Sequence, residues 1–383
     1  MAGLKLKHND RARVLSGHPW VFAGEVQKLP PASADGQALE LRDSGGRPLG
    51  SGLVNTRSQI LWRRFSRKRE ELDDAVLERL IKNSIDRRKG LKLGRLVWSE
   101  SDMLPGLVID RYEDAFSVQT LTLGMDQRLE KIRDILLKLL KPRLIVERNE
   151  VPVRALEGLP ERNGVLHGEA APFRVKAGKI EYQIDLLAGQ KTGMYLDQLQ
   201  EHLAVATMAS GKRILDAFCN QGGFALQCAA AGAEQVHGVD ISEEAIGSAR
   251  ENAERNGLSK IDFRTANVFD FLHTKNVGKW DVIILDPPSF ARGKARLAEA
   301  HRGYKEINLR ALQNLEIGGR LATYSCSHHI TTGMFLNILT EAARDARKDV
   351  HIVRHCHQPP DHPVLVGMPE SEYLKGFILE VVE

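Results

Sequence analysis

Two aspartates with a fixed spacing are the first residues in this sequence whose types suggest chemistry. Asp216 closes an apolar run, and the loop after it contains Phe218 and the glycine pair that begins at Gly222; Asp240 closes the next apolar run, 24 residues after Asp216. The glycines let a ligand approach the backbone closely. An acid in the place of Asp216 can hold an ammonium group, and one in the place of Asp240 can accept ribose hydroxyls. Asp240 alone could instead cap a helix that begins near Ile241.

Further polar residues follow the next two apolar runs. Asn267 could accept a hydrogen bond from an adenine amino group through its amide oxygen. In Asp286-Pro287-Pro288 the prolines must end the strand and form a rigid turn. This turn resembles motif IV of RNA and base methyltransferases, where it faces the target base. The loop from Asp216 likewise resembles motif I of class I methyltransferases. An ordinary turn at the end of a strand is the alternative interpretation for Pro287 and Pro288.

A cysteine between two serines, Cys326, follows a further apolar run. Cytosine C5 is a poor nucleophile, but a thiolate that adds at C6 makes C5 able to attack a sulfonium methyl group. Cys326 is therefore the predicted nucleophile, with packing in the core as the alternative fate of a cysteine. The same reaction needs a base for the C5 proton, for which we predict Glu370 first and Asp361 second. A charged surface loop is the alternative for that segment.

The four cysteines form no CxxC pair, so neither a zinc site nor a disulfide framework is expected. Cys356 lies between His355 and His357, but neighbouring residues of a strand point to opposite faces, so we expect packing there and no metal.

The elements that must position these residues alternate along the C-terminal half. Apolar runs predict strands over 213–216, 235–240, 261–265, 281–286 and 320–325, and helical spacing predicts helices over 223–231 and 242–256. This alternation predicts an α/β domain with a parallel, doubly wound sheet. Ligands of such sheets bind beyond the carboxyl ends of the strands, where the residues above fall.

The N-terminal half has a different pattern of apolar and turn-forming residues. Short apolar runs broken by Gly, Pro and Asp predict a small β domain over 1–70. Residues 71–185 read as an α+β domain, with helices over 71–92 and 125–140, short strands near 96–98, 107–110, 116–121 and 144–147, and a hairpin over 173–187. The third predicted domain spans 186–383.

Charge is distributed unevenly along the chain. The net charge is +4, but residues 1–100 hold 20 Lys and Arg against 12 Asp and Glu, a local excess of +8. The basic run that contains Arg63 and Arg64 is suited to phosphate contact, with a charged linker as an equal alternative. No apolar run is long enough for a membrane span, and the first ten residues lack a signal peptide's apolar stretch, so a cytoplasmic location is expected.

These motifs together resemble one family over nearly the whole chain: the bacterial ribosomal RNA large subunit methyltransferase I family, which methylates cytosine C5 in 23S rRNA. The resemblance rests on segments 17–24, 100–107, 190–198, 216–223, 286–288, 302–308, 325–327 and 361–377. It implies an RNA-binding PUA β-barrel, a central α+β domain and a Rossmann-like catalytic domain that binds S-adenosyl-L-methionine.

The resemblance also implies roles for individual residues. Thr192, Tyr195 and Gln198 would line the cofactor together with Asp216, Phe218, Gly222, Asp240, Asn267 and Asp286, and Asp286 would also take part in catalysis. Pro287, Pro288 and Lys305 would face the RNA. In two-cysteine RNA cytosine methyltransferases a second Cys stands where Pro288 stands here, so product release must use another group. A homodimer is a further expectation.

Two alternatives stay open. One is an rRNA guanine methyltransferase with a related core, which needs no thiol; Cys326 argues against it. The other is a non-catalytic RNA-binding assembly factor, against which the set of Asp216, Asp240, Asp286 and Cys326 argues.

Overall fold

A computed structural model describes residues 3–9, 12–189, 192–273, 280–290, 293 and 296–383. By contacts the chain divides into two compact units. The first consists of Met1–Val175, Ile184–Leu196 and Pro360–Ser371, and the second of Lys176–Gln183, Asp197–Pro359 and Glu372–Glu383. This division groups the first two predicted domains except for residues 176–183, which belong to the second unit, and adds to them residues 186–196 and 360–371 of the third. The three consecutive domains therefore stay a prediction. Gln190 and Lys191 of the family motif lie outside the described residues.

The first unit begins with a five-stranded sheet in the order β1-β3-β4-β5-β2. Its strands are β1 (Gly3–Lys5), β2 (Trp20–Val21), β3 (Ala38–Arg42), β4 (Pro48–Val54) and β5 (Trp62–Ser66). β1 pairs with β3 in parallel, and the other pairs are antiparallel. Trp62 is fully buried in the core of this sheet, and its indole N–H donates to the Leu39 carbonyl at 2.9 Å. The predicted small β domain is therefore present.

A second five-stranded sheet follows, in the order β10-β9-β8-β7-β6. Its strands are β6 (Leu93–Trp98), β7 (Leu107–Tyr112), β8 (Ala115–Thr120), β9 (Leu144–Arg148) and β10 (Asn163–His167), and its helices are α1 (Asp74–Arg87), α2 (Leu123–Asp126) and α3 (Leu129–Leu140). Asp73 caps α1 by accepting the Val76 N–H at 2.9 Å. The helix predicted over 125–140 is in fact two, α2 and α3, separated at Arg128.

Short 3₁₀ helices complete the first unit: η1 (Arg13–Ser16), η2 (Ala23–Glu25), η3 (Ala32–Ala34), η4 (Ser99–Asp102), η5 (Pro152–Glu157) and η8 (Pro369–Ser371). The predicted hairpin is also present, as the two-stranded sheet of β11 (Phe173–Ala177) and β12 (Ile180–Ile184).

The second unit is built on a seven-stranded sheet in the order β15-β14-β13-β16-β17-β19-β18. Its strands are β13 (Arg213–Ala217), β14 (Gln235–Asp240), β15 (Ile261–Thr265), β16 (Trp280–Leu285), β17 (Leu315–Ser325), β18 (Val350–His357) and β19 (Lys375–Val381). β13 to β17 are mutually parallel, as predicted, so their carboxyl ends meet at one edge. β19 is antiparallel to both of its neighbours, which alternation alone did not predict.

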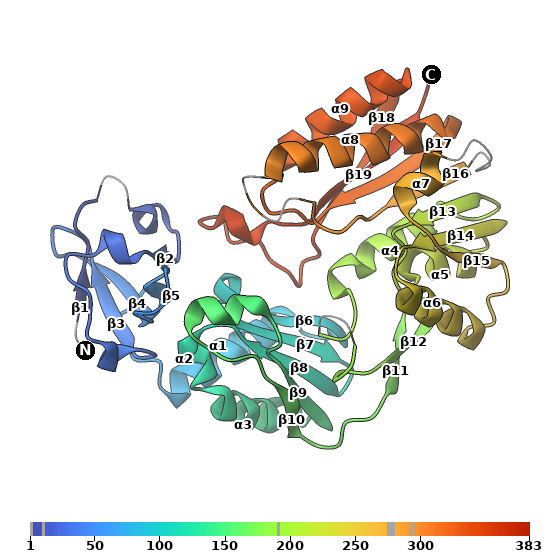
Figure 1. The fold of residues 1–383 in the computed structure, drawn as a ribbon. Helices are drawn as coiled ribbons and strands as arrows, with labels where there is room; N and C mark the ends of the chain where they lie inside the picture. Colours follow the sequence, from blue (N-terminus) through green and yellow to red (C-terminus); the bar gives the residue numbers. More distant parts are fainter. Residues whose placement is uncertain (1–2, 10–11, 190–191, 274–279, 291–292, 294–295) are drawn as a thin grey trace. The chain divides into compact units, whose positions relative to one another are not determined.

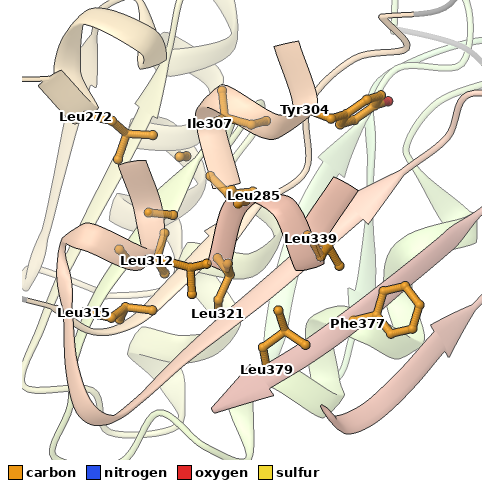
Figure 2. Packing of buried hydrophobic residues seen from close by; sticks show 14 of the residues in the cluster. Leu272, Leu285, Tyr304, Ile307, Leu312, Leu315, Leu321, Leu339, Phe377 and Leu379 are labelled. Atoms are coloured by element: carbon orange, nitrogen blue, oxygen red, sulfur yellow. The ribbon is translucent and has the colours of Figure 1, made fainter. Parts of the chain in front are cut away.

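Helices cover both faces of this sheet (Figure 1). They are α4 (Leu199–Ala206), α5 (Gly223–Ala230), α6 (Glu243–Arg255), α7 (Val268–His273), α8 (Leu297–Gln313) and α9 (Thr332–Ala346), with η6 (Leu196–Gln198) ahead of α4. Leu285 and Leu321 of the sheet pack against Ile307 of α8 and Leu339 of α9, and Phe377 of β19 joins the same buried cluster (Figure 2). None of the helices described here combines the length and the apolar composition that a membrane span needs.

Candidate active site

The loop after β13 has an unusual backbone. Phe218, Asn220 and Gly222 all have positive φ, of 68°, 48° and 83°. This conformation is strained for residues other than glycine, and it is held here because the Asn220 N–H donates to Asp240 Oδ2 at 2.9 Å. At Gly223 an added Cβ would lie 2.4 Å from the His202 ring, so only glycine fits. The loop therefore brings motif I and Asp240 together, as the sequence predicted.

Asp216 is fully buried at the end of β13. Its Oδ2 accepts the Ala225 N–H of α5 at 2.9 Å, while Oδ1 has no hydrogen-bond partner among the described residues. Burial raises the pKa of this carboxyl to about 8, and Asp286 and Asp240 add to the shift. A buried acceptor without a donor is costly, and the ammonium group of a bound amino-acid moiety would remove that cost. The site thus fits the predicted methionine part of the cofactor.

Asp240 and Asn267 have local partners besides their predicted ligands. Asp240 Oδ1 accepts the Ser242 N–H at 2.9 Å, and Ser242 itself caps α6, so the alternative of Asp240 as the helix cap is not what is observed. Each Asp240 oxygen keeps a further lone pair for a ribose hydroxyl. Asn267 Oδ1 already accepts the Phe269 N–H at 2.9 Å in the first turn of α7. Its predicted adenine contact must share that oxygen.

Gln198 and Asp286 meet in the second unit. Gln198 Nε2 donates to Asp286 Oδ1 at 3.0 Å, and Gln198 is 3% exposed. Gln198 Oε1 is buried and has no partner among the described residues, which leaves an acceptor for a ligand donor. The predicted cofactor residues Gln198 and Asp286 are thus adjacent.

Thr192 and Tyr195 belong to the first unit. The Thr192 hydroxyl donates to the buried carboxylate of Asp110, and Tyr112 lies within hydrogen-bond distance of it. The Thr192 hydroxyl therefore anchors its segment to β7. The predicted cofactor contacts of Thr192 and Tyr195 stay predictions.

Cys326 and the Asp286-Pro287-Pro288 turn come together at the ends of β17 and β16. Cys326 Sγ lies 4.0 Å from the Pro287 carbonyl oxygen, and the thiol is partly exposed. Pro287 is buried and Pro288 is exposed, so the turn presents one proline outward. The other three cysteines are buried, and burial raises the pKa of each thiol. Cys326 thus differs from them in the way that a nucleophile requires.

A cluster of hydroxyl groups lies beside Cys326, and the sequence did not predict it. The Tyr304 hydroxyl lies 2.9 Å from Ser327 Oγ and accepts from Ser325 Oγ at 3.0 Å, and Ser289 Oγ lies 2.9 Å from Ser327 Oγ. Lys375 is also buried here, 3% exposed. A single charge at the start of the apolar run 376–379 was the available sequence signal for Lys375.

The predicted bases lie in the first unit and have other partners. Glu370 accepts from Arg13 at 2.6 Å, and its second oxygen lies 3.1 Å from His18 Nε2. These bonds hold the pKa of Glu370 below its usual value despite partial burial, which makes it a weaker base. Asp361 accepts the Arg95 backbone N–H at 2.8 Å and lies 3.1 Å from His362 Nδ1. The predicted roles of Glu370 and Asp361 as the base therefore stay predictions, with both carboxylates already bound to other groups of the first unit.

Three cations predicted to contact RNA bind acceptor groups of the protein itself. Arg64 is 2% exposed and donates to the Gly17 carbonyl. Arg63 pairs at 3.0 Å with both Glu100 and Glu157. Lys305 pairs with Asp345 at 2.7 Å and thereby joins α8 to α9. The predicted phosphate contacts of these three residues stay predictions, because each cation would have to exchange an acceptor of the protein for a phosphate.

No group of three or more His, Cys, Asp or Glu side chains that could hold a metal occurs in the described ranges.

Comparison with known proteins identifies the class. A family model described as an S-adenosylmethionine-dependent methyltransferase matches residues 166–373, and a PUA-like domain model matches residues 4–67. A solved SAM-dependent methyltransferase from Streptococcus mutans has the same fold, with a TM-score of 0.83, 22% identity and 100% of both chains covered. The protein is therefore an S-adenosylmethionine-dependent methyltransferase with a PUA-like N-terminal domain.

Closer relatives narrow the class to one family. A protein named ribosomal RNA large subunit methyltransferase I from Aeromonas hydrophila is 38% identical, with 99% of each chain covered. The protein of that name from Aeromonas salmonicida is 40% identical, with 96% of each covered. The chain belongs to the ribosomal RNA large subunit methyltransferase I family.

Proposed function

We propose that this enzyme transfers a methyl group from S-adenosyl-L-methionine to C5 of a cytosine in 23S rRNA, with Cys326 as the nucleophile. The observation that carries the proposal is the 4.0 Å approach of Cys326 Sγ to the Pro287 carbonyl, which joins the thiol to the turn expected to face the base. Methylation of a guanine nitrogen gives no reason for a cysteine in this place.

Each group in the proposed reaction has a separate part. The thiolate of Cys326 adds to C6 of the cytosine, which places electron density at C5. The bound S-adenosylmethionine would supply an electrophilic methyl group. C5 then forms a bond to that methyl group as its bond to the sulfonium sulfur breaks, which leaves S-adenosylhomocysteine. A base then takes the C5 proton, the C5–H electron pair restores the C5–C6 double bond, and the Cys326 sulfur leaves as thiolate. The proposal does not assign the base to Glu370, because its carboxylate already binds Arg13 and His18.

Residues of the second unit would hold the cofactor. Asp216 Oδ1, which has no hydrogen-bond partner in the described part of the chain, suits its ammonium group, and the lone pairs of Asp240 suit its ribose hydroxyls. Gln198, which is buried, donates to the half-buried Asp286, which directly follows β16. Asn267 is proposed for the adenine edge.

RNA binding is proposed for the PUA-like domain through cations other than those first predicted. Arg67, Lys68 and Arg69 directly follow β5 and are all exposed. Phosphate contacts by exposed Lys and Arg bind polyanions without sequence specificity. The target base must then be unpaired or flipped out to reach Cys326.

A cytoplasmic location and a homodimer are also proposed. The location follows from the proposed rRNA substrate. β18 forms one edge of the seven-stranded sheet, and its Ile352 and Val353 are 40% and 48% exposed. Such an edge strand can pair with a second copy.

The test is methyl transfer to unmodified 23S rRNA, with mass mapping of the product. We expect 5-methylcytosine from the wild-type protein. We expect Cys326→Ala to lose at least about 100-fold in turnover, because the covalent step is gone. Cys228→Ala is the matched control, since Cys228 is buried and plays no part in the step. Full turnover by Cys326→Ala, or a methylated guanine as product, would show the proposal to be wrong.

A further inference from the structure

Lys375 is a buried lysine beside the proposed nucleophile, and no step described so far uses it. It is the first residue of β19 and pairs in register with Ser325, the residue before Cys326. Its ammonium donates to the carbonyls of Ser327 and Ile330, each at 2.7 Å. These two carbonyls flank the turn that follows Cys326, so the ammonium joins β19 to that turn.

Burying a lysine to make this connection costs free energy. Its side chain is 3% exposed, and burying an ammonium disfavours its charged form. Burial lowers the pKa of Lys375 to about 8, so most of the group is still protonated at pH 7. The negative charges that oppose this shift come from Cys326 and Glu372, in that order. The interaction is reciprocal: a thiolate at Cys326 favours the ammonium, and the ammonium favours the thiolate.

We propose that Lys375 is a positioning residue for Cys326, which fixes the turn after the thiol and stabilises its thiolate form with a buried positive charge. The inference rests on the proposed function, because it concerns the same nucleophile. Without the positive charge of Lys375, the Cys326 thiol would be protonated at neutral pH, since an ordinary cysteine has a pKa of about 8.5.

Other polar groups near this turn act on the same equilibrium. Tyr304 from α8 interacts electrostatically with Cys326, but burial raises the pKa of Tyr304, so it stays neutral at pH 7 and can only donate or accept a hydrogen bond. Asp286 precedes Pro287, whose carbonyl oxygen lies 4.0 Å from Cys326 Sγ. Glu372 interacts electrostatically with Lys375, and the ring of His328 lies 5.6 Å from that of Tyr373. Among the described residues of this turn region, Lys375 is a buried cation whose electrostatic interaction with Cys326 favours the thiolate.

The test measures the thiol directly. In the full-length protein, the alkylation rate of Cys326 by iodoacetamide is measured from pH 5.5 to pH 10 by peptide mass spectrometry. Lys375→Gln removes the charge but keeps an amide N–H for the carbonyls of Ser327 and Ile330, and Lys375→Met removes both. We expect each folded variant to react about tenfold or more slowly at pH 7 and to approach the wild-type rate at high pH.

Two further variants separate charge from structure. Lys375→Arg keeps the positive charge and is expected to retain a profile close to wild type. Lys212→Met removes an exposed lysine of the same unit and should leave the profile unchanged. A Lys375→Gln protein that is folded by circular dichroism and has the wild-type pH profile would overturn the inference. So would a Lys375→Arg profile that matches Lys375→Gln.

The outcome is distinguishable from failure of the proposed function. Alkylation reports the ionisation of Cys326 whether or not the protein methylates cytosine. If Cys326→Ala keeps methyl transfer, the proposed function fails while the effect of Lys375 on the thiol can still be measured. If Cys326→Ala is inactive but Lys375→Gln shifts neither the alkylation profile nor the pH profile of methyl transfer, only the inference about Lys375 fails.

Discussion

At the scale of single residues, the site contains a buried carboxyl that lowers the stability of the folded protein while no ligand is bound. Asp216 is fully buried, has one unpartnered oxygen among the described residues, and has a pKa raised to about 8 by burial. In the unfolded chain the same carboxyl ionises near pH 4. Between these values the folded state binds the proton more strongly, so the stability of the ligand-free protein falls as pH rises.

Without bound cofactor, the stability of Asp216→Asn should therefore fall less with rising pH than the stability of the wild type. The thermal midpoint of the variant minus that of the wild type should increase by about 2 °C or more from pH 5 to pH 8, because the variant has no carboxyl to ionise at position 216. The same variant should bind S-adenosylmethionine at least about tenfold more weakly, since the charge opposite the ammonium is lost. Differential scanning calorimetry and titration calorimetry measure the two effects. Asp349→Asn, at an exposed residue of the same unit, is the control, and equal cofactor affinity in Asp216→Asn and wild type would contradict the assignment.

Glu370 provides a second prediction at this scale. Because its carboxylate binds Arg13 and His18, Glu370→Gln should reduce the turnover of bound RNA by less than about threefold, whereas loss of a general base costs about 100-fold or more. Single-turnover methylation of 23S rRNA measures the difference. A 100-fold loss of turnover in a variant with unchanged thermal midpoint would restore Glu370 as the base.

At the scale of elements, charged side chains connect the two sheets of the first unit. Glu157 of η5 is 3% exposed, and its carboxylate accepts from Asn55, Ser58 and Arg63. Arg63 of β5 also pairs with Glu100 of η4 and lies over the Trp20 ring. The basic run after Trp62 thus divides into buried cations, which join elements, and exposed cations, which face solvent.

This division predicts opposite consequences for two neighbouring arginines. Arg63→Ala should destabilise the first unit by about 3 kcal/mol, because two buried carboxylates lose a partner. Arg67→Ala should leave stability within about 0.5 kcal/mol of wild type, as is usual for an exposed side chain. Urea unfolding followed by tryptophan fluorescence measures both. Equal stability of the two variants would show that the buried ion pairs contribute nothing net.

At the scale of the whole molecule, the excess positive charge of residues 1–100 concerns the partner and not the fold. If Arg67, Lys68 and Arg69 contact phosphates, their joint replacement by Gln should lower the slope of log affinity against log salt by about 2 to 3, or somewhat under one unit per contact. Filter binding to a 23S rRNA fragment between 50 and 300 mM salt measures the slope. Turnover of bound RNA should not change, and an unchanged slope would assign RNA binding to another surface.

Local patterns in the sequence are enough to determine much of this protein. Alternation and apolar runs predicted the parallel strands β13 to β17, because strand and helix periodicity are written in neighbouring residues. Glycines and prolines marked Gly222 and Pro287 as loop positions, since their backbone limits act wherever they occur. The order of strands then placed Asp216, Asp240, Asp286 and Cys326 at one edge, because parallel strands share their carboxyl ends.

Only the tertiary structure decided which charges are free and which are engaged. Arg13 and Glu370 are 357 residues apart in the chain, and nothing near either residue indicates the pair. The same holds for Arg63, for Lys305 and for Lys375, whose strand β19 enters the sheet between β17 and β18. The physical reason is that a long charged side chain has no strong local preference. Its state depends on burial and on partners that only the folded chain brings within a few ångströms.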